Sequence, residues 1–99
     1  MSTSAAETVV EIRTFYERLQ REIKPDQAID IIASGHFGAF RTNKVIDNGH
    51  GFLQITLIGD RNQPQAFLLA PFEQCSFMFS IVSPTEEERV NRPPMGFGP

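Results

Sequence analysis

The spacing of apolar residues changes at Gly35, and this change constrains the fold more than any other feature of the chain. Before Gly35, apolar side chains recur every three or four residues, the spacing that lines one face of an α-helix. These residues are Val9, Ile12, Tyr16, Leu19 and Ile23. After Gly35, Leu53, Ile55 and Leu57 alternate with polar neighbours, as one face of a β-strand requires. Helices followed by successive strands are typical of an α+β domain.

Two helices are expected at the start of the chain. The first would cover residues 4–23, where Ser4 and Glu7 have the spacing of a capping box. Pro25 would end this helix and begin a short second helix over residues 25–34. The buried side of the second helix would consist of Ala28, Ile29, Ile31 and Ile32.

About four strands are expected after the helices, separated by turns rich in Gly, Asn and Pro. The strands would lie within residues 36–47, 52–58, 65–70 and about 72–82. The turn after the first strand contains an Asn-Gly pair, which is typical of tight hairpins. Short connections favour antiparallel neighbours. The sequence therefore predicts an α+β fold with two N-terminal helices packed on a curved antiparallel β-meander of about four strands.

The chain of 99 residues is expected to form one domain over residues 1–84. Residues 85–99 would form an extended or disordered C-terminal tail, because the prolines and glycines of residues 92–99 disfavour a helix or a central strand. One helical turn is expected near the start of this tail. A helix layer on a small sheet leaves apolar surface uncovered, so we expect a homo-oligomer and favour a dimer.

Composition excludes several classes of protein. Nine Lys and Arg stand against twelve Asp and Glu, for a formal net charge of −3, and the basic residues form no cluster. Nucleic-acid binding is therefore not expected. No apolar run approaches the ~20 residues of a membrane span, and residues 1–11 do not have the pattern of a signal peptide. The single cysteine cannot form an internal disulfide. These features predict a soluble cytoplasmic protein.

Three groups of reactive residues have simple structural explanations. Cys75 with His36 or His50 could form a nucleophile and base, but Cys75 lies on the apolar face of an expected strand, which favours an inert thiol. The two histidines and Asp47 are of metal-ligating types without the spacing of a metal site. Asp47 and Asp60 occupy turns, where aspartate usually bonds its own backbone. The sequence therefore identifies no catalytic residue, metal ligand or cofactor, and enzymatic activity is left open but not favoured.

Aromatic residues of the strand region supply the best candidates for a binding surface. Phe37, Phe40 and Phe77 could line an apolar pocket or contact, and Arg41 could provide a polar group directed into it. The function expected from these features is that of a non-catalytic binding or interaction module. Its partner would be a protein or a small apolar ligand.

Two segments resemble known families and supply the alternatives. Phe15-Tyr16-Glu17-Arg18-Leu19, followed by the short helix expected over 25–34 and a sheet, is similar to the start of nuclear-transport-factor-2-like domains. That resemblance implies a cone whose apolar cavity binds small molecules or performs acid–base chemistry. The segment from Gly35-His36-Phe37-Gly38 to Asp47 resembles the first half of an Sm-type barrel, which implies an RNA-binding ring. The second expected helix and the lack of a basic patch differ from that family.

Overall fold

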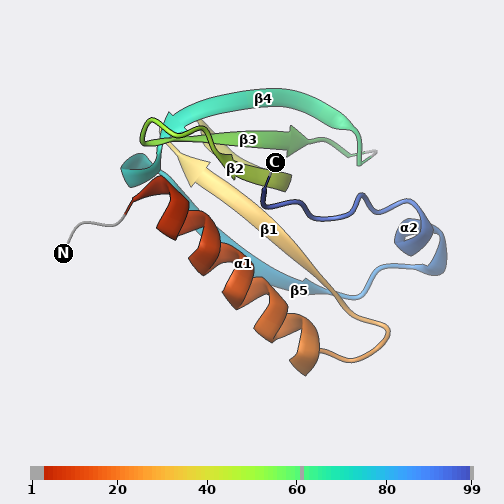
Figure 1. Ribbon diagram of the computed structural model, residues 1–99. Coiled ribbons are helices and arrows are strands. Elements are labelled where there is room, and N and C mark those ends of the chain that lie inside the picture. The colour runs from red at the N-terminus through yellow and green to blue at the C-terminus, as the bar shows by residue number, and fades with distance from the viewer. Residues whose placement is uncertain (1–3, 61, 99) are drawn as a thin grey trace.

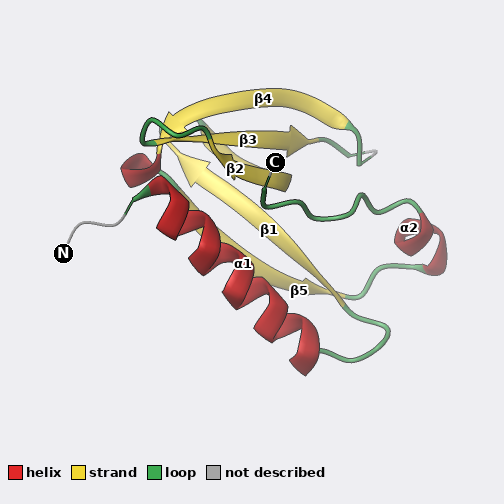
Figure 2. Cartoon of the chain, in the orientation of Figure 1, coloured by secondary structure: helices red, strands yellow, loops and turns green. Residues whose placement is uncertain are grey.

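One long helix and a five-stranded antiparallel sheet make up the fold, which a computed structural model describes for residues 4–60 and 62–98 (Figure 1). The sheet has the strand order β4-β3-β2-β1-β5, and all four neighbouring pairs are antiparallel. The predicted α+β class is confirmed (Figure 2). The elements are α1 (Ala5–Glu22), β1 (Ala28–Gly35), β2 (Gly38–Asp47), β3 (Phe52–Ile58), β4 (Pro64–Pro71), a 3-10 turn η1 (Phe72–Gln74), β5 (Ser76–Val82) and α2 (Glu86–Val90).

Helix α1 begins where the sequence places its cap. The Ser4 Oγ accepts a hydrogen bond from the Glu7 N–H at 3.0 Å, which satisfies one of the free amides of the first turn. Val9 and Ile12 are buried along one face, as the apolar spacing requires. The predicted first helix is therefore confirmed. Neither helix among the described residues is long and apolar enough to cross a membrane.

The prediction of a second N-terminal helix is wrong, because Ala28–Gly35 form the strand β1. This strand pairs with β2 and β5, so that Ile31 faces both Thr42 and Phe79 across the two ladders. Ile29, Ile31 and Ala33 alternate as the buried residues of this strand, but the apolar residues from Ala28 to Ile32 also fit one face of a helix. The short helix on which the similarity to nuclear-transport-factor-2-like domains depended is therefore absent from this segment.

The expected count of four strands is also wrong, since β1 makes five. The strands β2, β3 and β4 lie within or close to the expected ranges, but residues 72–82 divide into η1 and β5. After η1 reverses the chain, β5 pairs with β1 and not with the preceding strand β4. Phe79 of β5 meets Phe15 of α1 edge to face, with ring centroids 4.8 Å apart. β4 and β5 consequently form the two edges of the sheet.

The hydrophobic core lies between α1 and the concave face of the sheet. Figure 1 shows α1 running beside β1, while β3 and β4 curve over the other side of the core, and α1 also lies close to β2. The largest fully buried side chains come from four positions on three of the strands: Ile31, Val45, Leu53 and Ile55. A sheet that bends around one such cluster leaves its outer face to solvent or to a partner.

Candidate functional site

The two edge strands carry exposed apolar side chains and no charged residue. The sequence of β4 is PQAFLLAP and that of β5 is SFMFSIV. Phe67 of β4 is 77% exposed and Met78 of β5 is 57% exposed. Soluble proteins usually protect edge strands with charged side chains or with a covering element, because an unprotected edge pairs readily with another strand. These two edges are therefore the strongest candidates for an interaction surface.

The strand registers show which side chains share a face. Leu68 of β4 faces Ile55 of β3 and packs against the core, so its neighbours Phe67 and Leu69 lie on the outer face. In β5, Phe77 and Phe79 pack against the core, so Met78 between them also lies on the outer face. Both edges thus present apolar side chains on the outer face, and each edge strand has a neighbouring strand on one side only in the described part of the chain.

The structure brings the predicted aromatic residues to one end of β1. The rings of Phe37 and Phe40 stack with centroids 6.5 Å apart, and Phe37 packs against the core. Phe40 of β2 and Phe77 of β5 both face Ala33 of β1, so they flank it on one face of the sheet. The binding of a small apolar ligand by these three phenylalanines stays a prediction.

Arg41 does not join the three phenylalanines. It is the next residue along β2 from Phe40, and adjacent side chains of a strand point to opposite faces. Its Nη2 donates to Asn62 Oδ1 at 2.9 Å and lies 3.5 Å from Asp30 Oδ1. The Nε of Arg41 is buried and has no hydrogen-bond partner among the described residues.

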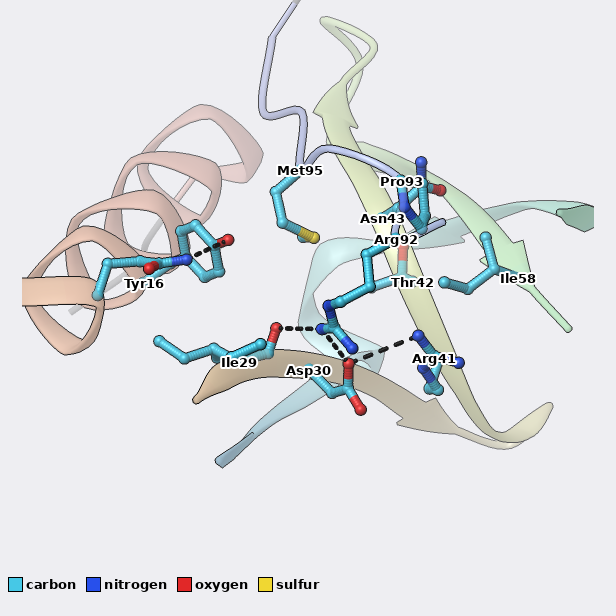
Figure 3. Close-up of a pocket in the computed structure, with 12 residues that line it drawn as sticks. Tyr16, Ile29, Asp30, Arg41, Thr42, Asn43, Ile58, Arg92, Pro93 and Met95 are labelled. Carbon is cyan, nitrogen blue, oxygen red and sulfur yellow. Dashed lines mark hydrogen bonds and ion pairs between the residues drawn. The ribbon is translucent and has the colours of Figure 1, made fainter. Parts of the chain in front are cut away.

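Arg92, from the C-terminal tail, joins Asp30 and Arg41 in a polar cluster (Figure 3). Its Nη2 donates to Asp30 Oδ1 at 2.6 Å and to the Ile29 carbonyl oxygen at 3.1 Å. The cluster borders a small pocket of about 70 Å³, which also has Tyr16 and Met95 among its lining residues. The pairing of Asp30 with Arg92 could not be predicted from the sequence, because 62 positions separate the two residues and no local pattern connects them.

We call residues 92–97 the strap, because they lie across the region where β1 and β2 separate. The Gly96 N–H donates to the Asn43 carbonyl oxygen at 2.9 Å, and the Val45 N–H donates to the Gly96 carbonyl oxygen at 3.0 Å. Phe97 lies against Tyr16 of α1 with ring centroids 5.6 Å apart. The strap is thus bonded to β1 at one end and to β2 at the other.

The histidines considered for chemistry lie in separate turns. His36 precedes β2 and His50 follows it, so the ten residues of that strand lie between them. Asp47 Oδ1 accepts the Gly49 N–H at 2.9 Å, which is the backbone bond expected of a turn aspartate. Within residues 4–60 and 62–98, no group of three or more His, Cys, Asp or Glu side chains could hold a metal ion.

Cys75 follows η1 and is half-buried. Its Sγ lies 3.5 Å from the Pro71 carbonyl oxygen, and burial raises the pKa of the thiol above its ordinary value. A thiol with a raised pKa is a poor nucleophile near neutral pH, because little of it is ionised. This environment favours an inert, structural Cys75 thiol over a catalytic nucleophile.

Comparison with known proteins assigns no family to this arrangement. The chain matches no protein-family model, and no curated protein and no solved structure compared with it is similar to it.

Proposed function

We propose that this protein is a non-catalytic interaction module that assembles with copies of itself through its two sheet edges, and that it acts in the cytoplasm. The observation that carries the proposal is the pair of uncharged edge strands with exposed Phe67 and Met78. Burying a large apolar side chain contributes about 1.5–3 kcal/mol, so several such residues at one contact provide a substantial driving force.

The two edges favour pairing of β4 from one copy with β5 from the next. In that arrangement, Phe67 and Leu69 of one copy lie beside Met78 of its neighbour on the outer face. The core-side residue Leu68 lies beside Phe79 of the neighbour. A dimer, the homo-oligomer that the sequence favours, would leave one edge of each copy uncovered if it were joined through one kind of edge. Pairing of two different surfaces continues from copy to copy and closes into a ring when the rotation permits.

The experiment places one lysine on each edge in separate variants. Phe67→Lys adds a charge to β4, and Met78→Lys adds a charge to β5, where each disfavours strand pairing. Each variant alone should be a monomer by sedimentation, because one of the two required surfaces is lost. An equimolar mixture should form a dimer of one copy of each, because an intact β5 and an intact β4 remain.

Val90→Lys is the matched control, since Val90 lies on α2 and is more exposed than either edge residue. It should assemble like the unaltered chain. Should Met78→Lys form a dimer that persists when Arg92→Ala and Phe97→Ala are added, pairing between identical β4 edges would replace the proposed arrangement. Should both variants assemble normally, the edges would not be the contact surface.

An RNA-binding ring of Sm type is a second candidate, favoured by one observation. The segment before Gly35 is a strand, so one helix precedes a continuous run of antiparallel strands, and a second N-terminal helix no longer distinguishes the chain from that family. The net charge of −3 does not favour binding to phosphates. Retention on a polyanion resin at low salt tests this candidate, and a chain that only binds protein should flow through.

A further inference from the structure

The sheet divides between β1 and β2. The ladder between these strands runs from Gly35 and Gly38 as far as Ile31 and Thr42. Before Ile31, the described pairs of β1 are with β5, and beyond the bulge at Thr42 the described pairs of β2 are with β3. The backbone of Ile29 on one side of this gap and the backbone around Lys44 on the other therefore need partners from elsewhere.

The strap supplies those partners, as its hydrogen bonds to both strands show. Arg92 bonds the Ile29 carbonyl oxygen and the Asp30 carboxylate on the β1 side. Gly96 forms a parallel bridge with Lys44 on the β2 side, through one donated and one accepted hydrogen bond. A peptide that binds in this gap thus needs an extended backbone, a cation that pairs with Asp30 and an aromatic ring that packs against Tyr16.

We propose that the gap is a binding slot for an extended peptide, and that the strap of a second copy can occupy it in place of the chain's own strap. The chain's own strap lies in the slot in this structure, so its fit to the slot is shown. Every copy of the chain carries the same strap. The exchange uses the slot and not the edges β4 and β5, so it goes beyond the proposed function.

The connection to the strap favours such an exchange. Residues 83–91 link β5 to the strap, and the helix α2 within them contains no buried residue. Within residues 4–60 and 62–98, the hydrogen bond that joins α2 to a distant segment runs from Arg89 Nη2 to the Asp26 carbonyl oxygen, at 3.4 Å. No strap residue is fully buried. Because a neighbour's slot offers the same bonds, exchange of identical segments costs little free energy.

Tyr16 provides a direct readout, since it is the single tyrosine and the chain contains no tryptophan. The recipient is the full chain with Arg92→Ala and Phe97→Ala, whose slot is intact and whose own strap has lost two contacts. The donor is the full chain with Asp30→Lys and Tyr16→Phe. Its strap is intact, its slot repels Arg92, and it contributes no tyrosine signal. Tyrosine emission from the mixture therefore reports the slot of the recipient alone.

The proposal predicts that excess donor returns at least half of the difference in tyrosine emission between recipient and unaltered chain. A donor that also carries Arg92→Ala and Phe97→Ala should have no effect. An unchanged signal with folded donor and recipient would overturn the exchange. Failure of the edges to pair would not alter this readout, because it follows Tyr16 and not the mass of the assembly.

Hydrogen exchange on the unaltered chain covers the case in which the recipient does not fold. Release of the strap exposes the Gly96 and Val45 amides without unfolding the sheet, so both should exchange at least tenfold faster than the Ile55 amide. Exchange of all three amides at one rate would show that the strap opens only when the whole protein unfolds, and would overturn the proposal.

Discussion

Arg92 Nη2 lies 2.6 Å from Asp30 Oδ1, so a side chain of the C-terminal tail is ion-paired with a central strand. The same guanidinium bonds the Ile29 carbonyl oxygen, and Arg41 approaches the same carboxylate from β2. Asp30 therefore connects three segments of the chain: β1, β2 and the strap. This connection makes the strap part of the folded structure.

The first prediction concerns the strength of this ion pair. Arg92→Ala should lower the free energy of unfolding by about 1–2 kcal/mol, because a charge-assisted hydrogen bond to a partly buried carboxylate is lost. The two side chains are 21% and 15% exposed, so solvent weakens the pair only in part. Arg13→Ala, on the exposed face of α1, is the control and should change stability little.

A double-mutant cycle with Asp30→Ala separates the pair from the other contacts of each residue. We expect a coupling of about 1 kcal/mol between Arg92 and Asp30 in urea unfolding. Strictly additive effects of the two substitutions would show that the short distance contributes nothing to stability.

The second prediction concerns Thr42, the buried polar residue at the bulge of β2. Its hydroxyl donates to the Thr56 carbonyl oxygen at 2.6 Å and accepts the Lys44 N–H at 3.2 Å. Thr42→Val keeps the shape but leaves both backbone groups without this partner, which should cost about 1–3 kcal/mol in urea unfolding. Thr14→Val on the exposed side of α1 should cost far less. Equal costs at the two positions would contradict a role for Thr42 in holding the bulge.

The third prediction tests the inner face of α1 with two substitutions close together on the same helix. Ile12 is 6% exposed and Val10 is 51% exposed. Ile12→Asp places a carboxylate in the core and should cost at least about 3 kcal/mol, enough to unfold much of a marginally stable domain. Val10→Asp should leave the melting temperature nearly unchanged. A similar loss of stability in both variants would mean that α1 packs through another face.

The fourth prediction concerns Glu88 in the cap of α2. The Thr85 N–H donates to Glu88 Oε1 at 2.8 Å, and the Glu88 N–H donates to the Thr85 hydroxyl. These bonds with Thr85, and to a smaller extent the charges of Arg92 and Arg41, lower the pKa of Glu88 below its ordinary value of 4.5.

A lowered pKa in the folded state fixes the sign of the pH dependence. The cap stabilises α2 above pH 4.5, and this contribution is lost as the pH falls through the lower pKa of the folded state. In an NMR titration, Thr85→Pro, which removes the donating N–H, should raise the pKa of Glu88 most, while Thr85→Ala, which keeps the N–H and loses the hydroxyl, should raise it less. A pKa of Glu88 that does not respond to Thr85→Pro would contradict the capping box.

Features set by neighbouring residues could be predicted from the sequence. The helix α1 followed from its apolar spacing and from Ser4 with Glu7, and the turn after β2 followed from Asn48 and Gly49. Gly49 indeed has a φ of +88°, a conformation that residues with a side chain rarely adopt. In each case, the residues that decide the conformation lie within a few positions of one another.

Features set by distant residues could not be predicted. The segment Ala28–Gly35 is a strand because it pairs with β2 and β5, and those partners come together only in the folded sheet. The edges of the sheet depend on β5 pairing with β1, and the polar cluster depends on Asp30 meeting Arg92. The aromatic residues near Ala33 could be named as candidates, but the separation of Arg41 from them depends on the register of β2.

The mass of the unaltered chain in solution, measured by sedimentation equilibrium over a range of concentrations, tests the central claim most directly. Pairing of β4 with β5 predicts an assembly of more than two copies of the 11.1 kDa chain, with a mass that is a whole-number multiple of this value. A mass of one copy at every concentration would contradict self-association, and a mass that never exceeds two copies would contradict the pairing of the two different edges.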